Sequence, residues 1–132
     1  MNPAQHLLIV EDNRSLRQML TWEFEDLGYR VTATDCCTAA IAAAETGQVD
    51  LGLLDYNLPD GCGMELVERL RALNPAMRII LCSGFVTALE CDQPCCRFQA
   101  KPVSAQRLHR LFQSDAEWPA SCTPHPGGGV PS

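Results

Sequence analysis

The sequence predicts an α/β fold: a doubly wound parallel sheet of five strands with helices on both faces. Short apolar runs such as Leu7–Val10 and Leu51–Leu54 are typical of strands that are covered on both sides. Segments with helical periodicity separate these runs, as crossover units require, because parallel strands cannot be joined by tight turns. Five such units fit the 132 residues of the chain, which is the length of one domain.

The first unit is the strand Leu7–Val10 followed by a helix. Asn13 can cap the start of this helix, and Gly28 ends it. One face of this helix is apolar at helical spacing and carries Leu16, Leu20, Phe24 and Leu27. Trp22 lies off this face. We favour packing of Trp22 at the helix margin over a place on a partner surface.

The next two units repeat this order. Arg30–Thr34 is rich in strand formers, and Thr38–Glu45 is an alanine-rich helix ended by Gly47. Leu51–Leu54 is the third strand, and Met64–Leu73 follows as a helix with apolar residues on one face. The order strand, helix, strand, helix therefore continues through the middle of the chain.

The last two units are less regular. Arg78–Cys82 is expected to be the fourth strand, and the segment Phe85–Arg97 shows little helical periodicity, so the fourth helix should be short or absent. Phe98–Ala100 is a short fifth strand. Ser104 can cap a final helix that carries Leu108, Leu111 and Phe112.

Residues 1–114 are expected to form this one domain. Residues 115–132 lose periodicity and are rich in proline and glycine, including the run Gly127-Gly128-Gly129. Such composition is typical of a flexible tail or linker rather than of a core.

Composition excludes several classes of function. The net charge is −6 and the ten basic residues are scattered, so direct nucleic-acid binding is not expected. No apolar run approaches the ~20 residues that cross a bilayer, and the N-terminus lacks the pattern of a signal peptide, so we expect a cytoplasmic protein without membrane contact. A reducing cytosol would keep the eight cysteines as thiols. The spacing Cys91-x-x-x-Cys95-Cys96 does not match a zinc ribbon.

Chemically useful side chains follow four of the five strands. Glu11 and Asp12 follow the first strand, Asp55 the third, Ser83 the fourth and Lys101 the fifth. Because a doubly wound sheet places its site at the carboxyl ends of the strands, these side chains should converge. The sequence thus predicts one polar site at one edge of the sheet.

The residue types at this site favour magnesium and phosphoryl chemistry. Three carboxylates repel one another unless a cation lies between them, and oxygen ligands without His or Cys favour Mg²⁺ over zinc. Lys101 suits a phosphoryl oxygen, and Ser83 adds a hydroxyl donor. With Asp55 as a carboxylate nucleophile, the set is suited to phosphoryl transfer onto an aspartate.

These residues resemble the receiver domain of two-component response regulators over about Leu7 to Phe112. Four motifs occur in the order of that family: the acids of Val10-Glu11-Asp12-Asn13, Asp55 with Pro59 and Gly63, Ser83-Gly84, and Lys101-Pro102. The resemblance implies a flavodoxin-like sheet with strand order 2-1-3-4-5.

The resemblance also implies a function. Asp55 would accept a phosphoryl group from a histidine of a partner kinase or phosphotransfer domain. The implied Mg²⁺ ligands are Glu11 through water, Asp12, Asp55 and the backbone carbonyl of Asn57. The implied phosphoryl-binding and switch residues are Ser83, Lys101 and Phe98. Such a domain is a signalling phosphoacceptor rather than an enzyme, although able to catalyse its own phosphorylation and dephosphorylation, and phosphorylation would bias a two-state surface.

Two alternatives remain open from the residues. A pseudo-receiver would be a protein-interaction module that is never phosphorylated, although neither the acids nor the lysine is lost here. A metal-dependent phosphatase with an aspartyl nucleophile would need a second acid at the position of Asn57. The sequence determines neither the oligomeric state, the cognate kinase nor the output.

Overall fold

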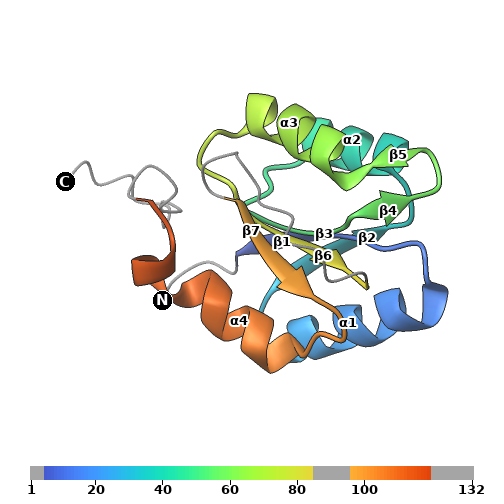
Figure 1. Cartoon of the computed structure of the whole chain (residues 1–132). Helices are drawn as coiled ribbons and strands as arrows, with labels where there is room; N and C mark the ends of the chain where they lie inside the picture. The colour runs from blue at the N-terminus through green and yellow to red at the C-terminus, as the bar shows by residue number, and fades with distance from the viewer. Residues whose placement is uncertain (1–4, 85–95, 120–132) are drawn as a thin grey trace.

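In the computed structural model, which describes residues 5–84 and 96–119, five parallel strands form a sheet between two pairs of helices (Figure 1). The sheet strands are β1 (His6–Val10), β2 (Arg30–Thr34), β3 (Leu51–Asp55), β6 (Arg78–Ser83) and β7 (Cys96–Ala100). The helices are α1 (Arg14–Asp26), α2 (Cys37–Thr46), α3 (Gly63–Leu73) and α4 (Ala105–Gln113). A small hairpin, β4 (Asn57–Leu58) with β5 (Gly61–Cys62), follows β3, and a 3-10 helix, η1 (Asp115–Glu117), follows α4.

The strand order is β2-β1-β3-β6-β7, which is 2-1-3-4-5 once the hairpin is set aside. This order confirms the predicted doubly wound fold. The register aligns the strand ends: Val10 lies opposite Leu54, Asp55 opposite Cys82, and Ser83 opposite Ala100. The residues that follow β1, β3, β6 and β7 are therefore brought to one edge of the sheet.

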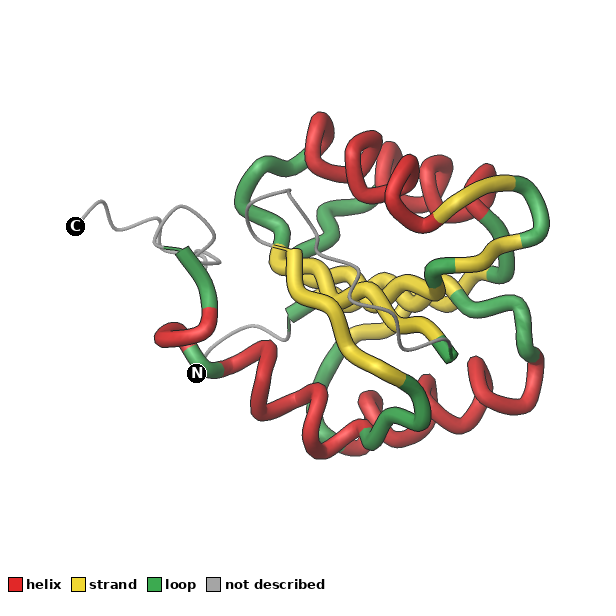
Figure 2. Tube along the Cα trace, viewed as in Figure 1, coloured by secondary structure: helices red, strands yellow, loops and turns green. Residues whose placement is uncertain are grey.

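Helices α1 and α4 cover one face of the sheet, and α2 and α3 cover the other (Figure 1, Figure 2). Side chains of β1 alternate between the two faces, as in any strand. Leu7 and Ile9 join the core with α1 and α4, whereas Leu8 and Val10 join the core with α2 and α3. Burial on both sides explains why the strands appear in the sequence as continuous apolar runs.

The predicted helix boundaries have the expected local causes. The Asn13 side chain accepts a hydrogen bond from the backbone N–H of Leu16 at 3.0 Å, and the Ser104 hydroxyl accepts one from Arg107 at 3.4 Å. Gly28 has φ +99°, a backbone conformation that favours glycine after a helix end. These three predictions from the sequence are confirmed.

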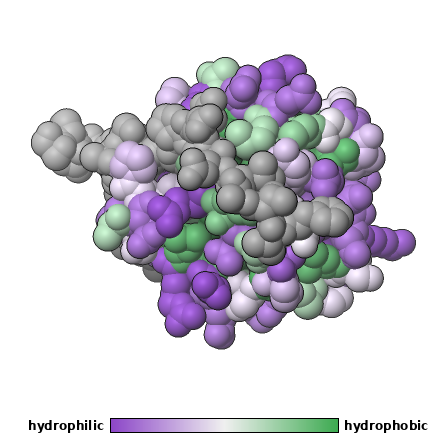
Figure 3. Space-filling model, viewed as in Figure 1, coloured by the Kyte–Doolittle hydropathy of each residue, from purple (hydrophilic) through white to green (hydrophobic). Residues whose placement is uncertain are grey.

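Trp22 is 62% exposed, so the favoured interpretation that it packs at the margin of α1 is wrong. Its helical spacing places it on the face of α1 that points away from the sheet. Hydrophilic side chains predominate on the surface shown in Figure 3, with smaller apolar patches between them.

The polypeptide stays packed on the domain beyond residue 114. The Trp118 ring stacks on Phe112 with centroids 6.4 Å apart, and its indole N–H donates to the Leu111 carbonyl at 2.8 Å. The expected start of the tail at residue 115 is therefore wrong for residues 115–118. The sequence around Trp118 has no periodicity, but burial of this one aromatic side chain in the core holds the segment on the domain. Residues 120–132, the rest of the expected tail, lie outside the described residues.

Three further expectations concern single segments or residue types. The short or absent fourth helix was expected within 85–97, and residues 85–95 lie outside the described part. Among the described cysteines, Cys36, Cys37, Cys62 and Cys82 are free, but Cys96 is disulfide-bonded, so the expectation of thiols throughout is wrong there. Sequence spacing did not indicate this bond. Within the described residues, none of the helices has the length and apolar character needed to cross a bilayer.

Candidate functional site

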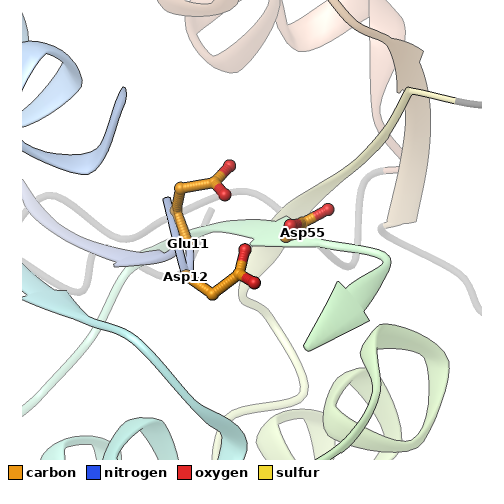
Figure 4. A group of neighbouring side chains, drawn as sticks. All are labelled: Glu11, Asp12 and Asp55. Atoms are coloured by element: carbon orange, nitrogen blue, oxygen red, sulfur yellow. The ribbon is translucent and has the colours of Figure 1, made fainter. Parts of the chain in front are cut away.

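Three carboxylates meet at the carboxyl edge of the sheet. Glu11 and Asp12 follow β1, and Asp55 is the last residue of the neighbouring strand β3 (Figure 4). One oxygen of each carboxylate lies within 4.8 Å of the other two. The sheet register thus assembles the acid cluster that the sequence predicted.

The three acids differ in burial. Asp12 is exposed, whereas Glu11 and Asp55 are 4% and 7% exposed. Burial raises the pKa of Asp55 to about 6, and the neighbouring Glu11 carboxylate adds to this rise. The Lys101 ammonium and a hydrogen bond from the Asn57 backbone oppose it. At neutral pH, Asp55 is therefore a buried carboxylate that lacks full charge compensation.

Lys101 brings the positive charge to this cluster. Its Nζ atom lies 2.8 Å from Glu11 Oε1 and 3.6 Å from Asp55 Oδ2. Burial lowers the pKa of Lys101, but the hydrogen bond to Glu11 and the charges of Glu11 and Asp55 outweigh burial and raise it. The backbone N–H of Lys101 donates to the Ser83 carbonyl at 2.8 Å, and the Lys101–Pro102 peptide bond is cis. Lys101 is the only lysine in the sequence.

The remaining predicted site residues are Ser83, Asn57 and Phe98, and each lies on a different strand. Ser83 is buried at the end of β6, one residue beyond the partner of Asp55. Asn57 lies on the hairpin with its side chain exposed, and its backbone N–H donates to Asp55. Phe98 lies opposite Leu81, before the end of β7, and packs partly buried on the core beneath α2 and α3.

Gly63 lets the chain return close to Asp55. A Cβ atom at position 63 would lie 2.6 Å from the Asp55 carbonyl oxygen and 2.7 Å from Leu81 Cδ1, which are distances that real Cβ atoms do not adopt. The Gly63 N–H donates to the Tyr56 carbonyl at 2.7 Å. The glycine is thus required by close approach, and it holds the end of β3 against the start of α3.

Two polar residues near the site were not predicted from the sequence. The Arg17 guanidinium donates to the backbone carbonyl of Glu11 at 2.8 Å, from the first turns of α1. Asp60 lies on the hairpin turn, and its carboxylate accepts from the start of α2. A signal for Asp60 was present, because the predicted second helix had no Ser, Asp or Asn directly before it.

The donor set is suited to a magnesium ion. The ligand atoms are carboxylate oxygens, which Mg²⁺ prefers, and the Lys101 ammonium pairs with Glu11 and Asp55 of the three acids. The buried Asp55 carboxylate carries a raised pKa, as expected where a further cation would stabilise the charged form. These residues fit a hard divalent cation.

Comparison with known proteins places this arrangement in a family. The family model described as "Response regulator receiver domain" matches residues 7–113. A CheY-like receiver domain from Methylobacillus flagellatus is 30% identical, with a TM-score of 0.75 over 83% of this chain and 97% of that one. A CheY-like receiver from Methanospirillum hungatei JF-1 is 27% identical, with a TM-score of 0.76 over 83% and 91%. This chain belongs to the response regulator receiver domain family.

Curated relatives are longer proteins. NtrC of Azospirillum brasilense, a DNA-binding transcriptional regulator, is 28% identical over 80% of this chain and 23% of its own length. KdpE of Escherichia coli, the KDP operon transcriptional regulatory protein, is 36% identical over 58% of this chain and 34% of its own length. The matched region is therefore about a quarter of NtrC and about a third of KdpE.

Proposed function

We propose that this domain takes a phosphoryl group onto Asp55 from a phosphohistidine of a partner kinase or phosphotransfer domain, with Mg²⁺ bound beside it. The observation that carries this proposal is a buried aspartate whose Oδ2 atom lies 3.6 Å from the only lysine of the chain, within one cluster with Glu11 and Asp12. Family membership supports the same role.

The reaction makes one bond and breaks one. A carboxylate oxygen of Asp55 attacks phosphorus, the P–N bond to the donor imidazole breaks, and the imidazole keeps the electron pair and takes up a proton. The product is an acyl phosphate. With a pKa of about 6, Asp55 is mostly ionised at neutral pH and can act as the nucleophile.

The protein side chains prepare this transfer. The hydrogen bond from the Asn57 backbone orients the Asp55 carboxylate. Lys101, held by Glu11 at 2.8 Å, offsets the negative charge that the phosphoryl group adds. We assign Ser83 as a hydroxyl donor to that group and Phe98 as the aromatic residue of the switch. Both are supported by their places on β6 and β7.

Mg²⁺ would be held by Asp12, Asp55 and the backbone carbonyl of Asn57, with Glu11 acting through water. When bound, the ion neutralises phosphoryl oxygens and the acids around them. We further propose that the domain acts in the cytoplasm, and that it catalyses its own phosphorylation and dephosphorylation. Its output would be exerted through a surface near β6 and β7, whose last residues pair beside the site.

The test is intact-mass spectrometry after incubation with acetyl phosphate and Mg²⁺. We expect one phosphoryl adduct in the wild type that depends on Mg²⁺ and is absent in Asp55→Asn. Asp26→Asn, which changes an exposed aspartate at the end of α1, is the matched control and should retain the adduct.

The alternative, a pseudo-receiver module, predicts a different result. A folded protein that binds Mg²⁺ but gains no adduct, either from acetyl phosphate or from a phosphorylated phosphotransfer domain, would contradict the proposal. An adduct that persists in Asp55→Asn would place the phosphoacceptor at another residue.

A further inference from the structure

Asp60 joins the loop after the phosphoacceptor strand to a distant helix. It lies on the turn of the β4–β5 hairpin, five residues after Asp55. Its carboxylate accepts from the backbone N–H groups of Cys37 and Thr38 at 2.7 and 3.0 Å and from the Thr38 hydroxyl at 2.8 Å. One side chain thus takes hydrogen bonds from two consecutive residues that begin α2.

Helix α2 has no cap of its own. Cys36, at the N-cap position, has an extended backbone (φ −155°, ψ 167°) but makes no side-chain hydrogen bond to the helix. The first N–H groups of a helix need acceptors from outside the helix, and a carboxylate there also interacts favourably with the helix dipole. The hydrogen bonds from Cys37 and Thr38 hold the pKa of Asp60 well below its usual range. Asp60 therefore serves as the N-cap of α2 from 23 residues away in the sequence.

The hairpin that carries Asp60 also carries the backbone of the site. Asn57 pairs with Cys62 at the base of the hairpin, and the Asn57 backbone donates to Asp55. At its other end the hairpin lies close to α2, because a Cβ atom on Gly61 would be 3.3 Å from Cys37 Sγ. The hairpin therefore spans the distance between the acid cluster and the start of α2.

We propose that Asp60 is a positioning residue: by capping α2 it anchors the β4–β5 hairpin and thereby fixes the Asn57 backbone for metal binding beside Asp55. This inference rests on the proposed function, because the Asn57 carbonyl is one of the ligands assigned there to Mg²⁺. Asp60 does not act as a metal ligand itself, since its carboxylate oxygens are engaged by α2.

Two substitutions, made singly and together, separate capping from anchoring. Asp60→Ala removes both the cap and the tether. Cys36→Ser provides a hydroxyl at the N-cap position, where the extended backbone suits a local serine cap. The double variant Asp60→Ala with Cys36→Ser thus has a capped α2 but a hairpin that is no longer tied to it.

Three quantities are measured: the unfolding temperature, hydrogen exchange of the Cys62 and Gly63 amides in metal-free protein, and the Mg²⁺ dissociation constant from an NMR titration. We expect Asp60→Ala to lower the unfolding temperature, accelerate exchange and weaken Mg²⁺ binding roughly tenfold, as lost support of a metal ligand does. In the double variant the unfolding temperature should recover, whereas exchange and Mg²⁺ binding should not. Cys36→Ser alone should bind Mg²⁺ like the wild type.

Recovery of Mg²⁺ binding together with stability in the double variant would overturn the proposal, because fraying of α2 would then explain the loss. An unchanged Mg²⁺ affinity in Asp60→Ala would overturn it as well. Failure of the wild type to bind Mg²⁺ would count instead against the proposed function. In that case amide exchange still decides the anchoring: unchanged exchange in the double variant overturns it, and faster exchange supports it.

Discussion

The two ends of the sheet differ in how completely their buried charges are compensated by neighbouring groups. At the amino end, Arg78 is 1% exposed, and its guanidinium donates to the Phe112 carbonyl at 2.6 Å and to Asp115 at 2.7 Å. It also lies over the Trp118 ring, 5.6 Å from the centroid. At the carboxyl end, three acids cluster, and a single lysine pairs with the two that are buried, Glu11 and Asp55.

The compensated charge at the amino end stabilises the fold, whereas the uncompensated charge at the carboxyl end destabilises it. At the amino end the buried cation has a carboxylate, a carbonyl and an aromatic face, so removing it should cost stability. At the carboxyl end the raised pKa of Asp55 shows that its charged form is disfavoured by the fold. This unbalanced negative charge lowers stability at neutral pH, and a bound divalent cation would offset it.

The largest expected effect is at the amino end. Arg78→Ala should lower the free energy of unfolding by about 3 kcal/mol, because it removes hydrogen bonds to α4 and η1 and opens a cavity beneath Trp118. Arg78→Met, which keeps most of the side-chain volume, should lose less. Urea unfolding followed by Trp118 fluorescence measures this if Trp22 is replaced by Phe. A loss below about 1 kcal/mol for Arg78→Ala would show that the two ends do not differ as described.

Asp55→Asn should stabilise the protein in the absence of metal. The folded pKa of about 6 lies above that of an unfolded aspartate. The contribution of Asp55 to the free energy of unfolding therefore falls as the pH rises from about 4 to about 6, and it stays at this lower value at higher pH. The variant should be more stable than the wild type by roughly 1 to 3 kcal/mol at pH 7.5, and this advantage should vanish near pH 4. Urea unfolding at several pH values tests this. A variant that is less stable than the wild type at pH 7.5 would contradict the charge imbalance.

Lys101→Met should have the opposite effect at the same site. Loss of the ammonium leaves Glu11 and Asp55 uncompensated, so we expect a destabilisation of roughly 1 to 2 kcal/mol at pH 7.5. The loss should shrink near pH 5, where Asp55 is mostly protonated. Because the chain has one lysine, ¹⁵N-lysine labelling gives a single Nζ signal that reports the pKa of Lys101 in the wild type. A value below that of a free lysine would contradict the pairing.

The smallest effect should come from the exposed partner of Arg78. The Asp115 side chain is 79% exposed, and asparagine keeps an oxygen acceptor, so Asp115→Asn should cost less than about 1 kcal/mol in urea unfolding. Glu117→Gln, in an ion pair with Arg97 that is exposed on both sides, is the control for a surface charge change. A loss equal to that of Arg78→Ala would mean that the ion pair, rather than the carbonyl and the ring, holds Arg78.

Much of the carboxyl end could be predicted from the sequence. Each acid follows an apolar strand directly, and strands that are parallel and neighbouring bring their ends together, so local order along the chain gave Glu11, Asp12, Asp55, Ser83 and Lys101 one common edge. The caps at Asn13 and Ser104 could also be predicted, because those hydrogen bonds reach only three residues along the chain.

The amino end and the hairpin were decided by tertiary structure. Arg78 binds Phe112 and Asp115, which are 34 and 37 residues away, and Asp60 caps a helix 23 residues before it. Trp118 belongs to the core although composition placed it in a tail. By itself, the sequence determined the strand order along the chain, the apolar faces and the acids at the strand ends, because these depend on local periodicity. Contacts between side chains distant in sequence have no such period, so only the folded structure could decide them.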